Sequence, residues 1–337
     1  MKAALLKCPN QIELINYSLP KIKPDELLIK VDTCGLCGTD YHIFRGEAKS
    51  KIPVIPGHEY TGTVIEKGTA VSEFQIDDHV VIDPNISCGN CFYCRTGKIQ
   101  FCTNLKALGV TQNGGFAEYS AVPSSQTYLI PKNLSFRVAA FTEPLSCCVH
   151  GIDQAAIKHG ESVVIIGAGT IGLLMLQLAS LGGSGKVIIV EPVESKRNLA
   201  MKLGADFCLD PDSQNITEEI QSLTSGGADV VIECAGSPVT VALSLQLLKR
   251  GGRVVIFGLA PKNESVNVNL QDFFLKELTI KGSLLNPFTF SRAIELLASN
   301  KINVEVFNPV QAKLEDLKDL LSQPKNLSVT KYQITLN

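Results

Sequence analysis

A glycine-rich turn between an apolar strand and an apolar helix limits the possible folds of this chain most. The run Gly167-Ala168-Gly169-Thr170-Ile171-Gly172 follows the apolar stretch Val163–Ile166 and opens the helix-like stretch Ile171–Leu181. The first glycine permits a tight turn, the second lets the backbone approach a pyrophosphate, and the third lets helix and strand pack closely. The pyrophosphate would lie at the helix N-terminus. The pattern predicts a dinucleotide site, and the alternative is a glycine-rich turn without a cofactor.

Apolar runs alternate with helix-like stretches in the second half of the chain. The runs are Val163–Ile166, Val187–Val190, Val230–Ile232 and Val254–Phe257. The helix-like stretches are Ile171–Leu181, Glu194–Leu203, Val239–Lys249 and, after Lys281-Gly282, Ser291–Ser299. Continuous apolar runs are typical of strands buried on both faces, and their alternation with helices predicts an α/β fold with a doubly wound parallel sheet.

The first part of the chain has a different texture, because it consists of short β-like runs with frequent Gly and Pro. Examples are Glu26–Val31, Tyr60–Ile65 and His79–Ile82. A chain of 337 residues is too long for one ordinary core. We therefore expect two domains.

The location of the protein is inferred from its cysteines and its apolar segments. The charge-free segment 162–185 is long enough for a membrane span, but its glycines fit a strand, a turn and a helix better. The apolar run Ala3–Leu6 stops at Lys7 and is too short for a signal peptide. The odd number of cysteines, 11, favours reduced thiols or metal ligands. We expect a cytoplasmic protein, and a net charge of -2 shows no general attraction to nucleic acid or membranes.

The choice of coenzyme is predicted from Glu191. It follows the run Val187–Val190 at the expected interval of about 20 residues from the glycines, where an acid binds the ribose 2′-OH. Its carboxylate would repel a 2′-phosphate, so NAD is favoured over NADP. Lys196 and Arg197 could soften this preference, or they could form an ordinary solvated helix face.

Four cysteines at x2, x2 and x7 spacing form a first candidate metal site. The segment reads SCGNCFYCRTGKIQFC, and its thiols are Cys88, Cys91, Cys94 and Cys102. Four thiolates around a tetrahedral ion leave no open position, which is typical of a structural zinc site. The alternatives are four unrelated thiols or a zinc ribbon for nucleic acid, but Arg95 and Lys98 form only a thin basic patch.

A second candidate metal site combines residues that lie far apart in the sequence. They are Cys37, the pair in Gly57-His58-Glu59, and Glu143 in Glu143-Pro144-Leu145. One thiolate, one imidazole and one carboxylate leave a coordination position for water or substrate, as a catalytic zinc requires.

Over essentially its whole length the sequence resembles the zinc-dependent medium-chain dehydrogenases. The motifs that carry the resemblance occur in the family's order: Cys37-Gly38-Thr39-Asp40-Tyr41-His42, Gly57-His58-Glu59, the four cysteines, Glu143-Pro144-Leu145, and Gly167–Gly172 with Glu191. A glutamate at position 143, where typical alcohol dehydrogenases have Cys, is similar to the polyol (sorbitol-like) and threonine dehydrogenase branch.

The resemblance implies the domains and the roles of the site residues. A GroES-like, β-rich catalytic domain would span 1–145 and be completed by 283–337, and a Rossmann NAD-binding domain would span 146–282. In the family a catalytic zinc lies between the domains, so two zinc ions per chain are expected. The implied ligands of the catalytic zinc are Cys37, His58 and Glu59, with Glu143 bound directly or through water. Thr39 would take the substrate proton and His42 would be a later station, although His42 could equally be a partly exposed loop histidine.

The implied reaction moves hydride from a secondary hydroxyl of a polyol, or of its phosphate, to NAD and gives a ketose. Zinc lowers the pKa of the hydroxyl, and the nicotinamide accepts the hydride. Sorbitol-type members carry an Arg-aromatic pair after the Lys-Gly that ends the last coenzyme-domain strand, whereas this chain has Lys281-Gly282-Ser283-Leu284-Leu285-Asn286 without Arg. Another sugar alcohol, a polyol phosphate or L-threonine is therefore expected, in a homodimer or homotetramer. The alternative from another class is a non-catalytic NAD-binding sensor, which would have no use for an open zinc position.

Overall fold

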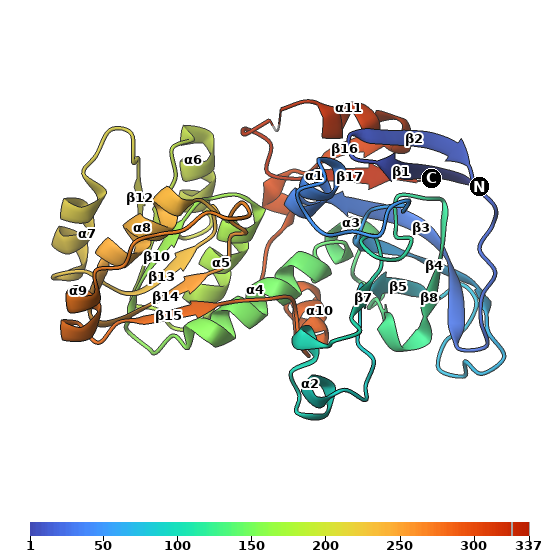
Figure 1. Cartoon of the computed structure of the whole chain (residues 1–337), viewed down its shortest axis with the longest axis horizontal. Coiled ribbons are helices and arrows are strands. Elements are labelled where there is room, and N and C mark those ends of the chain that lie inside the picture. The colour runs from blue at the N-terminus through green and yellow to red at the C-terminus, as the bar shows by residue number, and fades with distance from the viewer. Residues whose placement is uncertain (325, 337) are drawn as a thin grey trace. The chain divides into compact units, whose positions relative to one another are not determined.

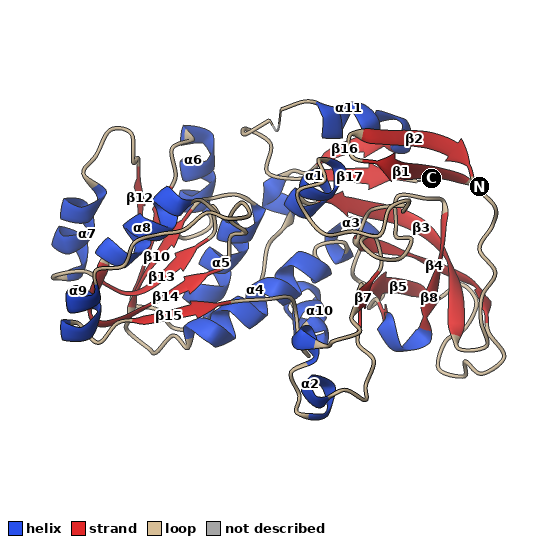
Figure 2. Cartoon of the chain, viewed as in Figure 1, coloured by secondary structure: helices blue, strands red, loops and turns tan. Residues whose placement is uncertain are grey.

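The chain forms two compact units, one inserted into the other. The computed structural model describes residues 1–324 and 326–336. The first unit contains Met1–Ser146 together with the chain from Pro287 onward, and the second contains Cys147–Asn286. Figure 1 follows the chain from its N-terminus to its C-terminus, and Figure 2 shows that strands are plentiful in both units. The first unit is thus assembled from two separate chain segments.

The inserted unit is built on a parallel sheet. Its strands are β10 (Ser162–Ile166), β11 (Lys186–Val190), β12 (Phe207–Leu209), β13 (Ala228–Glu233), β14 (Leu248–Ile256) and β15 (Thr279–Gly282). Their order is β12-β11-β10-β13-β14-β15, and all neighbours are parallel. This is the strand order of the Rossmann fold. Every residue of β10 is buried, so both faces of the sheet are covered. The predicted α/β fold with a parallel, doubly wound sheet is confirmed.

The helices of the inserted unit connect these strands. They are α5 (Thr170–Leu181), α6 (Glu194–Lys202), α7 (Ile216–Thr224), α8 (Pro238–Gln246) and α9 (Leu270–Leu275). The charge-free segment 162–185 contains β10, the glycine turn and α5. Among the described residues, no helix combines the length and the apolar character that crossing a membrane requires.

One predicted helix is longer than the helix in the structure. The pattern predicts a helix over Val239–Lys249, whereas α8 ends at Gln246 and β14 begins at Leu248. The N–H of Ala228 donates to the Leu247 carbonyl at 2.8 Å, and both Leu247 and Leu248 are buried. Pairing with β13 therefore overrides the local helical pattern.

The first unit is built on a mostly antiparallel sheet. Its strands are β3 (Glu26–Leu36), β4 (Glu59–Lys67), β5 (His79–Ile82), β8 (Tyr119–Pro123), β9 (Thr127–Leu129), β16 (Val310–Lys313) and β17 (Tyr332–Thr335). The order is β16-β17-β3-β4-β5-β9, β8 also pairs with β3, and only β16 and β17 are parallel to each other. The late strand β17 therefore lies beside β3, which comes from the start of the chain. The β-rich character expected for this part of the chain is confirmed.

Smaller elements complete the first unit. Two further strand pairs are β1 (Lys2–Cys8) with β2 (Gln11–Asn16), and β6 (Asn85–Ile86) with β7 (Lys106–Ala107). The helices are α1 (Gly38–Phe44), α2 (Phe92–Arg95), α3 (Phe136–Ala139), α4 (Thr142–Ala155, which continues into the second unit), α10 (Phe290–Ala298) and α11 (Leu317–Ser322). Leu317 and Leu321 of α11 and Ile334 of β17 are buried in the same core as Leu27 and Ile29 of β3. The two segments of the unit thus share one hydrophobic core.

Candidate metal and coenzyme sites

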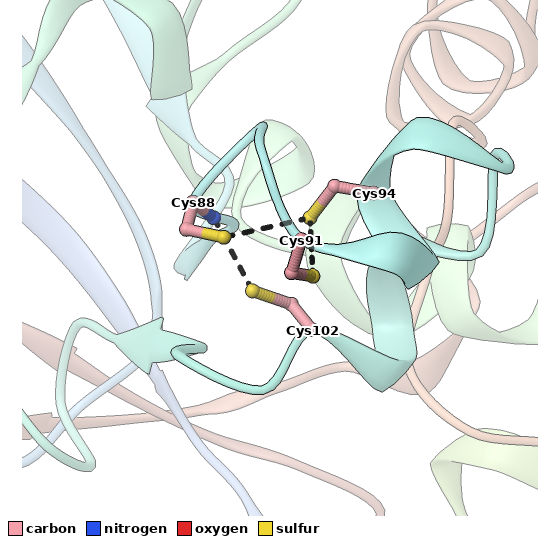
Figure 3. Close-up of side chains that lie close together, drawn as sticks. All are labelled: Cys88, Cys91, Cys94 and Cys102. Atoms are coloured by element: carbon pink, nitrogen blue, oxygen red, sulfur yellow. Dashed lines mark hydrogen bonds between the residues drawn. The ribbon is translucent and has the colours of Figure 1, made fainter.

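The four cysteines of the first candidate site come together in the loop between β6 and β7. The sulfur atoms of Cys88, Cys91, Cys94 and Cys102 all lie within 4.8 Å of one another. Figure 3 shows the four side chains pointing toward a common centre. Cys91 is the residue before α2, so Cys94 lies in the first turn of this helix, and Cys102 ends the short 3₁₀ helix Ile99–Phe101. Two short helical turns thus position Cys91, Cys94 and Cys102, and the loop after β6 brings Cys88 to the same point.

Backbone N–H groups around these sulfurs favour thiolates, the form that binds metal. The N–H of Cys88 donates to Sγ of Cys102 at 3.3 Å. The N–H groups of Cys94 and Thr103 lower the pKa of the Cys91 thiol to about 6. Burial and the neighbouring thiols raise the pKa of Cys94 to about 11. Several sulfurs at this spacing cannot all carry charge without a cation, so the donor set fits a tetrahedral ion.

The second candidate site forms where β3 and β4 pair. Cys37 directly follows β3, His58 directly precedes β4, and Glu59 is the first residue of β4. In the antiparallel register Gly35 of β3 is opposite Glu59. One ligand atom from each of Cys37, His58 and Glu59 lies within 4.8 Å of the others, with His58 and Glu59 buried and Cys37 partly buried. Strand pairing therefore unites two motifs that the sequence separates.

Asp40 is hydrogen-bonded to one member of this group and lies close to a second, a placement that the sequence analysis missed. Its Oδ2 accepts the N–H of Cys37 at 2.8 Å, and its Oδ1 lies 3.4 Å from Nδ1 of His58. Burial lowers the pKa of His58, but the charges of Asp40 and Cys37 raise it more, so this pKa lies well above its ordinary value. A carboxylate behind a histidine fixes the ring orientation in metal sites. Only the contact with Cys37 is local: Asp40 is the third residue after the N-cap Cys37, where a side chain reaches back to the N-cap N–H as in a capping box.

Lys331 is the second residue that the sequence analysis missed. It directly precedes β17, its side chain is only 6% exposed, and its ammonium forms an ion pair with Oε2 of Glu59. Burial lowers the pKa of Lys331, but Glu59 and Cys37 outweigh it and hold this pKa above its usual value. No local pattern marks Lys331, because 272 residues separate it from Glu59.

The other residues predicted to take part in catalysis, Thr39, His42 and Glu143, lie on two helices. Thr39 and His42 belong to α1 and, three residues apart, lie on one face of it. Nδ1 of His42 lies 2.7 Å from Oε2 of Glu47, and the His42 side chain is 36% exposed. Glu143 is buried in the first turn of α4 and is outside the group formed by Cys37, His58 and Glu59.

The glycines of the turn after β10 have the geometry that a phosphate loop requires. Gly167 has φ +96°. A Cβ on Gly172 would lie 1.8 Å from the carbonyl oxygen of Gly167, so a side chain there is impossible. A Cβ on Gly169 would meet nothing within 4 Å, and Gly169 is the residue before α5, which begins at Thr170. The open side of Gly169 lies at the helix N-terminus, where an anion is favoured.

Glu191 lies directly after β11 and is tied to the same turn. Its Oε2 accepts the N–H of Ala168 at 2.7 Å, and its Oε1 accepts the N–H of Val193 at 3.0 Å. Arg197 donates to the carbonyls of Glu191 and Pro192 and forms an ion pair with Asp210 at 3.1 Å. The guanidinium of Arg197 is therefore occupied by the protein itself.

Lys196, the other basic residue near Glu191, differs from Arg197. Its side chain has no hydrogen-bond or ion-pair partner within residues 1–324 and 326–336. Of the two basic residues, Arg197 is thus held by other residues of the protein and Lys196 is not.

Both units match known protein families. Residues 23–132 match the alcohol dehydrogenase GroES-like domain, and residues 170–299 match the zinc-binding dehydrogenase family. D-arabinitol dehydrogenase 1 of Uromyces fabae is 35% identical over 341 residues, which cover 100% of this chain and 97% of that protein. L-threonine 3-dehydrogenase of Pyrococcus furiosus is 37% identical over 300 residues, covering 87% of this chain and 86% of that protein. A zinc-binding dehydrogenase of Sinorhizobium meliloti 1021, solved bound to NADP, superposes with TM-score 0.95 and 41% identity, covering 99% of this chain and 98% of that one.

Proposed function

Because the chain belongs to the zinc-dependent medium-chain dehydrogenase family, we propose that it oxidises a secondary hydroxyl of a polyol or polyol phosphate. The hydride goes to NAD and the product is a ketose, in a reversible reaction. The observation that carries this proposal is the group of Cys37, His58 and Glu59, which provides a mixed set of ligands with a position left for substrate. The likeness to a D-arabinitol dehydrogenase supports the polyol class.

We propose a division of labour between the two units. Residues 1–145 with 283–337 form the catalytic domain, and residues 146–282 form the NAD-binding domain. The match of residues 23–132 to the GroES-like family supports the first assignment. The parallel sheet and its glycine turn support the second.

We propose Cys37, His58 and Glu59 as ligands of a catalytic zinc, with Glu143 bound directly or through water. The fit is supported by Oε1 of Glu59, which is buried and has no hydrogen-bond partner among the described residues. A buried acceptor of this kind is costly unless a donor or a cation satisfies it. When bound, zinc lowers the pKa of a hydroxyl that it contacts.

We propose that Cys88, Cys91, Cys94 and Cys102 hold a second, structural zinc. The convergence of the four sulfurs and the lowered pKa of Cys91 support this assignment. Two zinc ions per chain follow from the two groups together.

Proton transfer would use residues of α1. The Thr39 hydroxyl accepts the proton of the substrate hydroxyl, and His42 carries it toward solvent. The shared helix face and the exposure of His42 support this route. A proton on Nδ1 of His42 would be held by Glu47, which leaves Nε2 as the acceptor.

The coenzyme is proposed to be NAD rather than NADP. The buried carboxylate of Glu191 remains able to accept a ribose hydroxyl, because each oxygen has a second lone pair. Arg197 is engaged elsewhere, so Lys196 alone would favour a 2′-phosphate. The relative from Sinorhizobium meliloti was solved with NADP, so both coenzymes must be compared directly.

The chain is further proposed to be a cytoplasmic homodimer or homotetramer. All eleven cysteines are free of disulfides, which supports a reducing compartment. Strand β15 lies at an edge of its sheet, and Leu270, Phe274 and Leu275 of α9 are exposed. An edge strand near exposed apolar side chains favours association with a second copy. Sedimentation of the purified protein tests this, and a monomer at all concentrations would contradict it.

Turnover assays decide between the substrate classes. Purified protein is incubated with a panel of polyols, polyol phosphates and L-threonine, with NAD or NADP, and reduced coenzyme is followed by its absorbance. We expect turnover with a polyol or its phosphate and NAD. The second candidate is L-threonine 3-dehydrogenase, which the relative from Pyrococcus furiosus favours. Coenzyme binding without turnover on any member of the panel would favour the sensor instead.

A further inference from the structure

The ion pair between Lys331 and Glu59 crosses over a strand that separates them. Strand β17 pairs with β3, with Tyr332 opposite Leu36, and β3 pairs with β4, with Gly35 opposite Glu59. Lys331, which directly precedes β17, and Glu59, which begins β4, therefore lie on opposite sides of β3, and their side chains meet over Gly35. The candidate ligands Cys37, His58 and Glu59 lie at the same end of these strands, because Cys37 follows β3 directly.

Gly35 makes this crossing possible. A Cβ at position 35 would lie 2.1 Å from Oε2 of Glu59 and 3.0 Å from Cε of Lys331. Gly35 does not have a left-handed φ, so its backbone conformation is one that other residues adopt. What the site requires of Gly35 is therefore the absence of a side chain, which leaves room for the ion pair.

The two oxygens of Glu59 have different surroundings. Oε2 is held by Lys331, whereas Oε1 is buried and has no hydrogen-bond partner in the part of the chain that is described. If Glu59 turned away, a 6% exposed ammonium would lose its carboxylate, which is strongly unfavourable inside a protein. The ion pair thus leaves Oε1, and not Oε2, as the oxygen of Glu59 that is free to bind a metal ion.

We propose that Lys331 is a positioning residue for the mixed-ligand site. It holds Oε2 of Glu59 above Gly35 and so directs Oε1 to the point shared with Cys37 and His58. This inference rests on the proposed zinc site, and it assigns the last segment of the chain a role in metal binding. Groups that orient metal ligands typically contribute 10–100-fold to metal affinity.

A charge effect alone would have the opposite sign. Removing a cation beside a zinc site removes repulsion, and metal would then bind more tightly. A positioning role predicts weaker binding, because the freed carboxylate no longer directs Oε1. The direction of the change therefore separates the two explanations.

The experiment measures metal binding at the mixed site without relying on turnover. Apo protein is titrated with Co²⁺ in competition with a chelator, and the thiolate-to-cobalt absorption of Cys37 reports occupancy, with Cys37→Ser identifying that signal. We expect Lys331→Met to weaken binding roughly 10–100-fold and to alter the spectrum. Lys331→Arg should restore most of the affinity, because it keeps the cation. Gly35→Ala should weaken binding as Lys331→Met does, since it displaces Glu59 while keeping both charges.

Lys2→Met is the matched control. Lys2 forms an exposed ion pair with Glu315 at 2.9 Å, which also joins the C-terminal segment to the start of the chain. If Lys331 acted only by attaching this segment to the rest of the unit, Lys2→Met would weaken metal binding as well. Because we propose a specific action on Glu59, we expect Lys2→Met to leave metal affinity unchanged. Thermal unfolding of each variant confirms that it is folded, and Gly35→Ala decides the question if Lys331→Met does not fold.

The outcomes separate this inference from the proposed function. Wild-type protein that binds no metal through Cys37 would refute the proposed zinc site itself. Wild-type binding with unchanged or tighter binding in both Lys331→Met and Gly35→Ala would refute only the positioning role.

Discussion

Replacing Cys94 by Ser should open the four-cysteine segment while leaving the rest of the fold in place. Within residues 88–102 only Cys102 is buried. The aromatic residues Phe92, Tyr93 and Phe101 contact one another at ring distances of 5.5 and 5.9 Å, but all three are exposed. The segment has no hydrophobic core of its own, so the proposed ion is its main support.

The size of the effect follows from the number of ligands. Structural zinc contributes about 10–16 kcal/mol in small zinc-binding peptides. If the four thiolates share this equally, losing one removes roughly 3 kcal/mol, which shifts the opening equilibrium about 100-fold. Opening of the segment is therefore expected to be frequent in Cys94→Ser and rare in the wild type.

Limited digestion with trypsin measures this opening. The segment contains two exposed trypsin sites, Arg95 and Lys98. When cleavage follows the population of the open form, Cys94→Ser should be cut there roughly 100-fold faster than the wild type. Cys8→Ser, which changes a thiol outside both metal groups, is the control and should behave as the wild type. Cys94→Ser should also have a lower melting temperature, yet each folded molecule should keep much of its turnover.

The reasoning would be refuted if Cys94→Ser lost turnover while the segment stayed as resistant to trypsin as in the wild type. That result would place the chemistry at the four cysteines.

Three further changes test the other assignments. Cys37→Ser should leave a folded protein that binds NAD and keeps the metal of the four cysteines but has lost turnover. Activity per folded molecule and metal analysis check this. Retained turnover would refute the proposed catalytic site. Glu191→Ala should weaken NAD binding by about 1.5–3 kcal/mol, the worth of a charged hydrogen bond, and reduce the preference over NADP; titration with both coenzymes measures it, and a wild type that preferred NADP by about tenfold would contradict the assignment. The Arg253 guanidinium holds the pKa of Glu161 below its usual value of 4.5, so this carboxylate stabilises the fold above that pH and ceases to do so as pH falls through the lowered value. Glu161→Gln should thus be less stable than the wild type at neutral pH, with the gap closing in acid; urea unfolding across a pH series measures it, and a gap independent of pH would count against the ion pair.

The inserted unit, with its Rossmann-type sheet, was largely predictable because its sequence signals are local. Buried parallel strands are short apolar runs, and the run Val187–Val190 lies within β11, Lys186–Val190. The glycine turn was also predictable from the sequence, since its three glycines lie within six consecutive residues, 167–172, and each has its own steric reason. The end of α8 was mispredicted because pairing of Leu248 with β13 is decided by residues far away in the sequence.

The mixed candidate site of Cys37, His58 and Glu59 was only partly predictable, because strand pairing between distant segments brings its residues together. His58 and Glu59 are adjacent in the sequence, and the pairing of β3 with β4 brings Cys37 beside them. The family resemblance grouped these three residues before the pairing was known. The sequence around Lys331 does not predict its burial or its ion pair, because a single lysine before a short strand is usually exposed. Only the pairing of β17 with β3 places it beside Glu59. Its burial depends on β17 joining β3, which no periodicity near residue 331 encodes.

The position of β17 beside β3 also has a consequence for biosynthesis. At about 5–20 residues per second, the ribosome needs roughly 15–50 s to add the 272 residues between Glu59 and Lys331. During that interval the contiguous insertion Cys147–Asn286 emerges whole and has all its strands. The first unit then still lacks β16 and β17, and Glu59 has no counter-ion. On the nascent chain the parallel sheet of the inserted unit is therefore complete before β17 can pair with β3 and place Lys331 against Glu59.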